Sequence, residues 1–357
     1  MAAVFANLYG GCPMRMILIV NLVLLLLVGG YFFFKYKQYQ DFKQTPVEVQ
    51  DPVTVIIEKG TSWKQVSARL AEAKLITSER YFYYMIKEKE LGKKLQTGEF
   101  EFQGNLLPEE IAQSIIDGKV KLYTVTIPEG FNKYDLAALL ARLDWVRNGG
   151  EFLKYCDAPR ILRELGIPEA VTCEGLLFPS TYKFPRNVPV EEVISAMDKR
   201  MQEVLAKYRT EIKKAGFTPM QALTLASVIE KESGVRDEQP HIAAAFLNRL
   251  KQGIKLQSDP TVIYGLLPDF DGNITRKHLE TDHPHSTYTR QGLPATPICF
   301  PGENAIRSVV EPMQSEDIFF VATGEGRHHF SKTYAEHTAA VEHYQVKGLR
   351  TPFVWKK

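Results

Sequence analysis

One uncharged run near the N-terminus constrains this chain more than any other feature of its sequence. Residues 16–34 read MILIVNLVLLLLVGGYFFF, 19 positions without a charged side chain. A helix of that length crosses the hydrocarbon core of a bilayer, and residues 31–34 supply aromatic side chains, which are typical of a membrane interface. The run predicts a transmembrane anchor at 16–34, preceded by an N-terminal tail at 1–15.

A cleaved signal peptide is the competing interpretation of this run, with Leu22–Val28 as its apolar core and Gly29 and Gly30 as its small residues. The apolar run continues past these glycines, which favours an uncleaved anchor. The Gly-Gly-Cys triplet at 10–12 has no apolar segment before it and predicts no lipid attachment. Charge does not orient the span, because Arg15 alone precedes it whereas three lysines follow it closely.

The overall composition is that of a folded protein without a charge bias. The 357 residues are 45% hydrophobic and 24% charged, and 44 basic residues nearly balance 42 acidic ones. These values exclude a disordered chain or a collagen. They predict no nucleic-acid partner, because such a protein carries a basic face. The cysteines show no CxxC pair and no metal-ligand spacing, so their pairing stays open: Cys12, Cys156, Cys173 and Cys299.

A short unit occurs twice beyond a polar stretch at 35–51, which we interpret as a linker. Alternating apolar residues end in a glycine at 55–60 and again at 125–130, and each copy is followed by apolar residues at helical spacing. This pattern predicts a strand, a turn and an amphipathic helix. A looser copy runs from 100–104 into a helix at 108–116.

These units divide the chain into two domains. We expect a small α+β domain at 52–122, which is either a spacer or a carbohydrate-binding module, since a fold alone does not fix a function. After residue 124, longer helices alternate with loops rich in proline and aromatic residues. This change predicts a larger mixed helical and strand domain at 123–350, and the fold class of the whole chain is α+β.

The most informative helix begins at Thr218. Thr218 and Gln221 form the pattern of a capping box, with a proline at the first helical position. Residues 222–229 are apolar almost all round, which is typical of a helix buried in a core. Glu230 follows directly, whereas Glu232 points elsewhere at helical spacing.

A glutamate at the end of a buried helix has a raised pKa, which enables it to donate a proton near neutral pH. The spacing therefore makes Glu230 a candidate acid, as a single carboxylate rather than one of a pair. The competing interpretation makes Glu230 and Glu232 ordinary charges of the last helical turn, which pair with Lys231 or Arg236.

Motifs on both sides of this helix carry a family resemblance. They are EGLLFPSTYKF at 174–184, SVIEKE at 227–232, AAAFLNRLKQGIKLQSDPTVIYG at 243–265, HSTYTRQGLPATPICFPG at 285–302 and GRHHFS at 326–331. With these motifs in this order after a single anchor, the chain resembles the MltG-type (YceG-like) endolytic murein transglycosylase family. The resemblance covers nearly the whole chain.

The resemblance implies a LysM-like domain at 52–122 and a YceG-like catalytic domain at 123–350. It implies a single-pass protein of the cytoplasmic (inner) membrane with its catalytic domain on the periplasmic, extracytoplasmic side. Family members cleave the β-1,4 bond from N-acetylmuramic acid to N-acetylglucosamine in nascent glycan strands, a reaction suited to terminating glycan elongation. The implied partners are peptidoglycan strands, the membrane, cell-wall synthases and division proteins.

The family's catalytic glutamate falls at Glu230 in the matched SVIEKE motif. Hydrolytic glycosidases generally need two carboxylates, but here one suffices, because the 6-hydroxyl of the muramic acid attacks its own anomeric carbon. Glu230 protonates the leaving oxygen and then accepts the proton of that hydroxyl, which leaves a 1,6-anhydro end. We expect no cofactor and no metal, since the histidines at 283, 285, 328, 329 and 337 match no standard zinc spacing.

A polar and aromatic set in these motifs is suited to binding sugars. Each member has an alternative role in ordering a loop or the core. The predicted substrate-binding residues are Gln257, Asp259, Tyr264, Ser286, Tyr288, Asn248, Tyr182 and Glu174. Thr287 stands where the family often has proline, a change that removes no evident chemistry.

Two other functions stay open. A muramidase would hydrolyse the same bond with water and use Asp259 as its second carboxylate. A non-catalytic, membrane-tethered glycan-binding scaffold would rely on the small domain, but it has no use for a buried acid within a complete SVIEKE motif.

Overall fold

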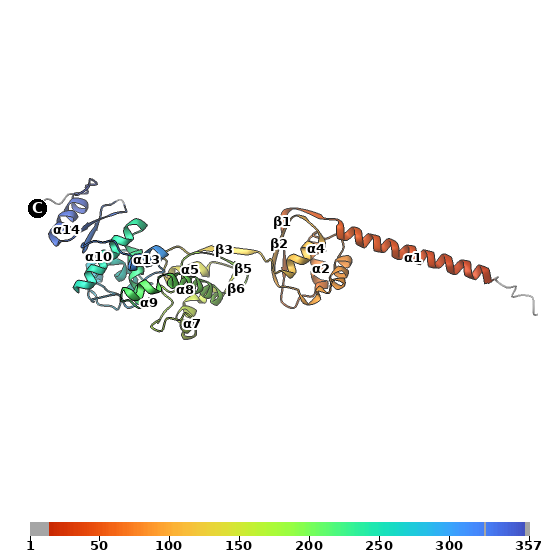
Figure 1. Cartoon of the computed structure of the whole chain (residues 1–357), viewed down its shortest axis with the longest axis horizontal. Helices are drawn as coiled ribbons and strands as arrows, with labels where there is room; N and C mark the ends of the chain where they lie inside the picture. Colours follow the sequence, from red (N-terminus) through yellow and green to blue (C-terminus); the bar gives the residue numbers. More distant parts are fainter. Residues whose placement is uncertain (1–13, 325, 354–357) are drawn as a thin grey trace, which may run out of the picture. The chain divides into compact units, whose positions relative to one another are not determined.

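The computed structural model describes residues 14–324 and 326–353, and the chain forms two compact units, Met1–Leu122 and Tyr123–Lys357 (Figure 1). Both units combine helices with two-stranded sheets, which confirms the predicted α+β class. Each unit buries a large hydrophobic core of its own.

The first unit is a long helix followed by a small sheet with three covering helices. Its elements are α1 (Met14–Gln44), β1 (Val47–Ile57), α2 (Trp63–Glu72), α3 (Glu79–Glu88), η1 (Leu91–Lys93), β2 (Gly98–Leu106) and α4 (Pro108–Ile116). Strands β1 and β2 pair antiparallel, with a register shift between Val49 and Val53. Apolar side chains of both strands and of α2, α3 and α4 share one core.

Helix α1 is the long helix of this unit (Figure 1), and much of it is apolar. Its segment Ile17–Gln44 is long and apolar enough to cross a membrane, a property that signal sequences near an N-terminus share. The predicted linker at 35–51 is wrong, because α1 continues to Gln44 and β1 begins at Val47. Tyr39 and Phe42 are only 4% and 5% exposed in the core of this unit. The stretch is polar on average, but these two aromatic residues lie one helical turn apart and pack the end of α1 against the core of the first unit.

The two strand–turn–helix copies are confirmed. Gly60 lies between β1 and α2, and Gly130 lies between β3 and α5, in the second unit. Their φ angles are +88° and +80°, a region that glycine enters without the steric cost of a Cβ atom.

The second unit is built around one buried helix. Its elements are β3 (Leu122–Thr126), α5 (Lys133–Ala141), β4 (Val146–Arg147), η2 (Gly149–Glu151), α6 (Phe152–Cys156), α7 (Pro159–Glu164), β5 (Thr181–Pro185), β6 (Val188–Pro189), α8 (Val190–Lys214), α9 (Pro219–Glu232), η3 (Arg236–Glu238), α10 (Gln239–Gln252), α11 (Asp259–Gly265), α12 (Arg276–Glu280), α13 (Glu303–Val310), β7 (Phe319–Ala322), β8 (His328–Ser331), α14 (Tyr334–Val341) and η4 (Glu342–Val346). The strand pairs are β3 with β5, β4 with β6 and β7 with β8.

Helix α9 is the centre of this unit and begins as the sequence predicts. Thr218 Oγ1 accepts a hydrogen bond from the Gln221 backbone N at 3.2 Å, and Gln221 Oε1 accepts one from the Thr218 N at 2.9 Å. Residues 222–229 are all buried, and α9 packs against α8, α10, α11 and α13. Because the cap fixes where the helix begins, it also fixes which side chains stand at its end.

A disulfide bond cross-links two segments of the second unit. Cys156 at the end of α6 is bonded to Cys173, 17 residues later. Cys299 is a buried free thiol, and Cys12 lies outside the described residues. The structure therefore pairs Cys156 with Cys173, a pairing that the sequence alone did not determine.

Candidate active site

The last turn of α9 presents two glutamates to different surroundings. Glu230 Oε2 accepts a hydrogen bond from the Gly302 backbone N at 3.0 Å. A Cβ atom placed on Gly130 would lie 3.8 Å from its Cγ, so glycine backbone encloses this side chain. Burial raises the pKa of Glu230, and the negative charge of Glu129 adds to the shift.

Glu232 points toward the segment that precedes α11. Its Oε1 accepts a hydrogen bond from Ser258 Oγ at 2.5 Å. Burial raises the pKa of Glu232 to about 7, with a further upward contribution from the charge of Asp259 and an opposing one from Arg249. A carboxyl group with that pKa exists in both protonation states near neutral pH.

A cavity of about 470 Å³ opens at Glu232. Side chains of α10, of the segment around the start of α11 and of the 285–288 loop form part of its wall, and β7, β8, α14 and η4 form the rest. Its lining residues are Glu232, Arg249, Gln257, Asp259, Tyr288, Phe319, Phe320, Val321, Ala322, His328, Tyr334, His337, Val341 and Gln345. Glu230 is not among them, so the cavity contains the second glutamate of the motif rather than the first.

Three of the predicted substrate-binding residues meet in this cavity: Gln257, Asp259 and Tyr288. Tyr288 donates its hydroxyl hydrogen to Asp259 Oδ1 at 2.6 Å. Gln257 has a φ of +50°, which is strained for a residue with a side chain. Its backbone N donates to the Thr287 carbonyl oxygen at 3.1 Å, which holds that conformation.

Thr287, the residue in place of the family's frequent proline, ties the two site loops together. Its hydroxyl accepts a hydrogen bond from the Ser258 backbone N at 3.0 Å and lies 2.9 Å from the Thr261 hydroxyl. Thr287 and Thr261 are fully buried. The threonine therefore supplies a specific link that a proline at this position would lack.

The other predicted binding residues are engaged within the protein, outside the cavity lining. Asn248 donates to the carbonyl oxygens of Ser315 and Asp317 at 2.9 and 3.0 Å. Tyr182 donates to the Phe178 carbonyl oxygen at 2.7 Å. Ser286 is buried and its hydroxyl accepts from the Thr289 N at 3.3 Å. Through these contacts the three side chains hold backbone groups at residues 178, 289, 315 and 317.

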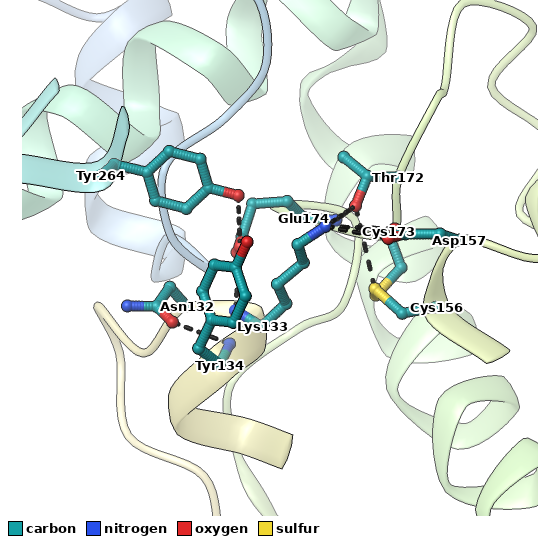
Figure 2. Close-up of a disulfide and its surroundings, with 9 residues drawn as sticks. All are labelled: Asn132, Lys133, Tyr134, Cys156, Asp157, Thr172, Cys173, Glu174 and Tyr264. Atoms are coloured by element: carbon teal, nitrogen blue, oxygen red, sulfur yellow. Dashed lines mark hydrogen bonds and ion pairs between the residues drawn. A yellow bond between two sulfur atoms is a disulfide. The ribbon is translucent and has the colours of Figure 1, made fainter. Parts of the chain in front are cut away.

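Glu174 and Tyr264 form a buried pair beside the disulfide (Figure 2). Glu174 Oε2 accepts hydrogen bonds from the Tyr264 hydroxyl and from the Lys133 backbone N, both at 2.9 Å. Burial raises the pKa of Glu174 to about 8, and its Oε1 has no partner among the described residues. Tyr264 belongs to α11, whose first residue is Asp259, so this pair holds the helix that brings Asp259 to the cavity.

Sequence reasoning missed several residues of the cavity. Glu232 was set aside because only the helical face, not the position of the cavity, can be derived from spacing. Phe319, Phe320 and Tyr334 come from β7 and α14, about 90 residues further along the chain, and no local pattern links them to α9. Within residues 14–324 and 326–353 no group of three or more His, Cys, Asp or Glu side chains is arranged to hold a metal ion.

Comparisons with known proteins agree with this architecture. The model of the YceG-like family matches residues 55–343. A Bacillus subtilis (strain 168) protein named endolytic murein transglycosylase is 30% identical over 336 residues, which cover 89% of this chain and 91% of that protein. A Streptococcus pneumoniae (strain D39) protein of the same name is 27% identical over 360 residues, which cover 90% of this chain and 64% of that protein.

A solved structure is also similar to this chain in sequence and fold. The crystal structure of a yceG-like protein from Listeria monocytogenes is 31% identical and superimposes with a TM-score of 0.55 over 82% of this chain and 99% of that one. Since the family match covers most of the chain, including both glutamates and all the cavity-lining residues except Gln345, the chain belongs to the YceG-like family.

Proposed function

We propose that the chain is a membrane-anchored endolytic murein transglycosylase whose general acid is Glu232. The observation that carries this proposal is the cavity in which Glu232, with a pKa of about 7, stands beside Asp259 and Tyr288. The names of the Bacillus and Streptococcus relatives support the reaction and the substrate class. A carboxyl group that titrates near 7 can donate a proton and afterwards accept one.

The proposed reaction cleaves the β-1,4 bond from N-acetylmuramic acid to N-acetylglucosamine without consuming water. Protonated Glu232 donates its proton to the leaving glycosidic oxygen as that oxygen separates from the anomeric carbon. The 6-hydroxyl of the same muramic acid then bonds to the anomeric carbon, and its proton returns to the Glu232 carboxylate. The strand ends in a 1,6-anhydro ring, and a nucleophile within the same sugar has a large proximity advantage over free water.

Glu230 remains the other candidate acid, and its surroundings make it the weaker one. Its Oε2 is engaged by the Gly302 backbone N, and it does not belong to the cavity lining. Glu232 also accepts a hydrogen bond, from Ser258 Oγ, so the difference that decides between the two glutamates is that only Glu232 lines the cavity. We therefore assign Glu230 to the packing of α9 against residues 130 and 302.

The test compares the full-length chain in detergent with two matched variants, Glu232→Gln and Glu230→Gln. Each is incubated with uncrosslinked glycan strands, and the products are identified by mass spectrometry after borohydride reduction. We expect non-reducible ends, one water lighter than hydrolysis products, from the wild type and from Glu230→Gln, and none from Glu232→Gln. Loss of activity only in Glu230→Gln would assign the acid to Glu230 instead.

A muramidase is the second candidate, and one observation favours it. Asp259 lines the same cavity as Glu232 and raises the pKa of that glutamate, so the cavity contains the two carboxylates that a hydrolytic glycosidase needs. Hydrolysis would leave reducible sugar ends and would depend on Asp259 as strongly as on Glu232. The same mass spectra separate the two reactions. If the wild-type protein binds strands without cleaving them, both enzymatic functions are contradicted and the non-catalytic glycan-binding scaffold is favoured.

The proposed location is the cytoplasmic membrane, with the second unit on the extracytoplasmic side. The apolar segment of α1 supports a single-pass anchor. The disulfide between Cys156 and Cys173 supports an oxidising compartment, because such bonds are rare in a reducing cytoplasm. Interactions with cell-wall synthases and division proteins stay predictions of the family resemblance.

The first unit is proposed as a LysM-like, glycan-holding domain. A groove of about 460 Å³ in this unit is lined by the β1–α2 turn, by α3 and by the segment before β2, with Trp63 and Tyr83 among its side chains. Aromatic faces and hydroxyl groups together suit a sugar. Tyr83→Ala is expected to weaken the binding of glycan strands to the full chain, and unchanged binding would leave this unit as a spacer.

A further inference from the structure

One side chain of the cavity wall is held by a buried glutamate that the proposed mechanism does not use. His328 begins β8, and its backbone N donates to Glu238 Oε1 at 3.0 Å, while its Nδ1 lies 3.0 Å from Glu238 Oε2. Glu238 is 8% exposed. Because both carboxylate oxygens contact the same residue, the position and the orientation of the imidazole ring are fixed.

The contact with Glu238 determines which ring nitrogen carries the hydrogen. A carboxylate accepts hydrogen bonds, so Nδ1 of His328 is the donor, and in the neutral ring Nε2 is then an acceptor. Within residues 14–324 and 326–353 no protein group donates to this Nε2, and His328 lines the cavity that contains Glu232. In its neutral form, this ring therefore gives the cavity an oriented acceptor to which no described protein group donates.

An apolar ring lies beside this acceptor. Phe320 meets the His328 ring edge to face, with centroids 5.4 Å apart, and Phe320 also lines the cavity. An acetamido group consists of an N–H donor next to a methyl group, so it is complementary to an acceptor nitrogen beside an aromatic face. A sugar hydroxyl would use the nitrogen, but unlike an acetamido group it brings no methyl group to pack against Phe320.

We propose that His328 and Phe320 bind the acetamido group of an N-acetylated sugar in the substrate. The amide N–H donates to Nε2 of His328, and the methyl group packs against the ring of Phe320. This inference rests on the proposed function, which supplies an N-acetylated glycan as substrate. It makes His328 a substrate-contacting residue that sets specificity, and Glu238 the residue that holds its ring.

Two substitutions of His328 separate this role from a structural one. In His328→Asn the amide nitrogen takes the place of Nδ1, so the bond to Glu238 is kept and the cavity acceptor is lost. In His328→Gln the amide lies near the position of Nε2, so an acceptor is kept and the side-chain bond to Glu238 is lost, while the backbone bond remains. A substrate-binding role predicts that His328→Asn weakens ligand binding more than His328→Gln does. A structural role predicts that His328→Gln weakens it more.

The measurement uses full-length Glu232→Gln protein in detergent, so that no ligand is consumed. It is titrated with the tetrasaccharide of N-acetylglucosamine and with the same tetrasaccharide after N-deacetylation. Protection of backbone amides in β7 and β8 from hydrogen exchange localises binding to this cavity rather than to the first unit. Since one neutral hydrogen bond is involved, His328→Asn is expected to raise the half-saturating concentration of the N-acetylated ligand about 3- to 10-fold.

The inference is overturned if the two ligands protect β7 and β8 equally in the protein with His328 intact, or if His328→Gln loses binding while His328→Asn keeps it. Its failure is distinct from failure of the proposed function. Wild-type protein that shows the N-acetyl preference but forms no 1,6-anhydro ends would contradict the reaction and leave the acetamido site standing.

Discussion

Two glutamates in the last turn of α9 have the same chemistry and different surroundings. Burial raises the pKa of both side chains. Glu230 is engaged by a backbone N–H and influenced by Glu129, whereas Glu232 is engaged by a hydroxyl group and influenced by Asp259. Because each glutamate has a different charged neighbour, substituting the neighbour shifts the pKa of one glutamate and not the other. The acid can therefore be identified without substituting either glutamate.

The pH dependence of the reaction gives the first prediction. An acid catalyst must be protonated, so kcat/KM is expected to fall as the pH rises through about 7, the pKa of Glu232. Asp259 raises that pKa, so Asp259→Asn lowers it and moves the descending limb to lower pH. Glu129 raises the pKa of Glu230 instead, and Glu129→Gln is expected to leave the limb in place. Initial rates measured from pH 5 to 9 would contradict the assignment if only Glu129→Gln moved the limb.

At the scale of elements, the cavity depends on how the segment before α11 is joined to the loop at 285–288. The buried hydroxyl of Thr287 accepts from the Ser258 N and lies beside the Thr261 hydroxyl. Gln257, whose φ is positive, is bonded to the same loop. These links place Asp259 and Tyr288 within hydrogen-bonding distance of each other.

Thr287→Ala removes these links and gives the second prediction. A buried backbone N–H loses its partner, so the free energy of unfolding of the second unit is expected to fall by about 1–3 kcal/mol. The rate of strand cleavage is expected to fall as well, because Asp259 is displaced. Thr287→Ser keeps the hydroxyl and serves as the control. Hydrogen exchange of second-unit peptides measures the stability, and equal exchange in the alanine and serine variants would contradict the role of the hydroxyl.

Short sequence patterns predicted individual helices and strands, whereas the composition of the cavity depends on packing between distant segments. The capping box at Thr218 and the glycines at 60 and 130 specify conformations within a few residues, so the sequence alone located α9 and both strand–turn–helix units. The end of α1 and the start of β1 were missed within residues 35–51, because the polar average of this stretch hides Tyr39 and Phe42, which are buried through contacts with distant elements. The choice between Glu230 and Glu232 depends on β7, β8 and α14, which no local spacing relates to α9.

At the scale of the whole molecule, a membrane-compatible helix belongs to one unit and a disulfide to the other. The apolar segment of α1 precedes the first unit's sheet without an intervening linker. The second unit contains both the proposed active site and the Cys156–Cys173 bond. An anchored enzyme of the cell wall requires this second unit to lie outside the cytoplasm.

The topology gives the third prediction. Protease added to intact spheroplasts is expected to degrade the second unit, because the proposed topology places this unit on the extracytoplasmic side. A cytoplasmic protein followed in the same sample serves as the control for lysis. Thiol labelling of denatured protein is expected to modify Cys156 and Cys173 only after reduction. Protection of the second unit until the cells are lysed would contradict the proposed orientation.

The most direct test of the central claim is the comparison of Glu232→Gln with Glu230→Gln on uncrosslinked glycan strands, with products identified by mass spectrometry. General acid–base catalysis contributes about 10²- to 10⁴-fold to a rate, so we predict a loss of that size in Glu232→Gln. Glu230→Gln, which keeps an acceptor for the Gly302 N, is predicted to form 1,6-anhydro ends at close to the wild-type rate. Anhydro ends from Glu232→Gln at the wild-type rate would contradict the account.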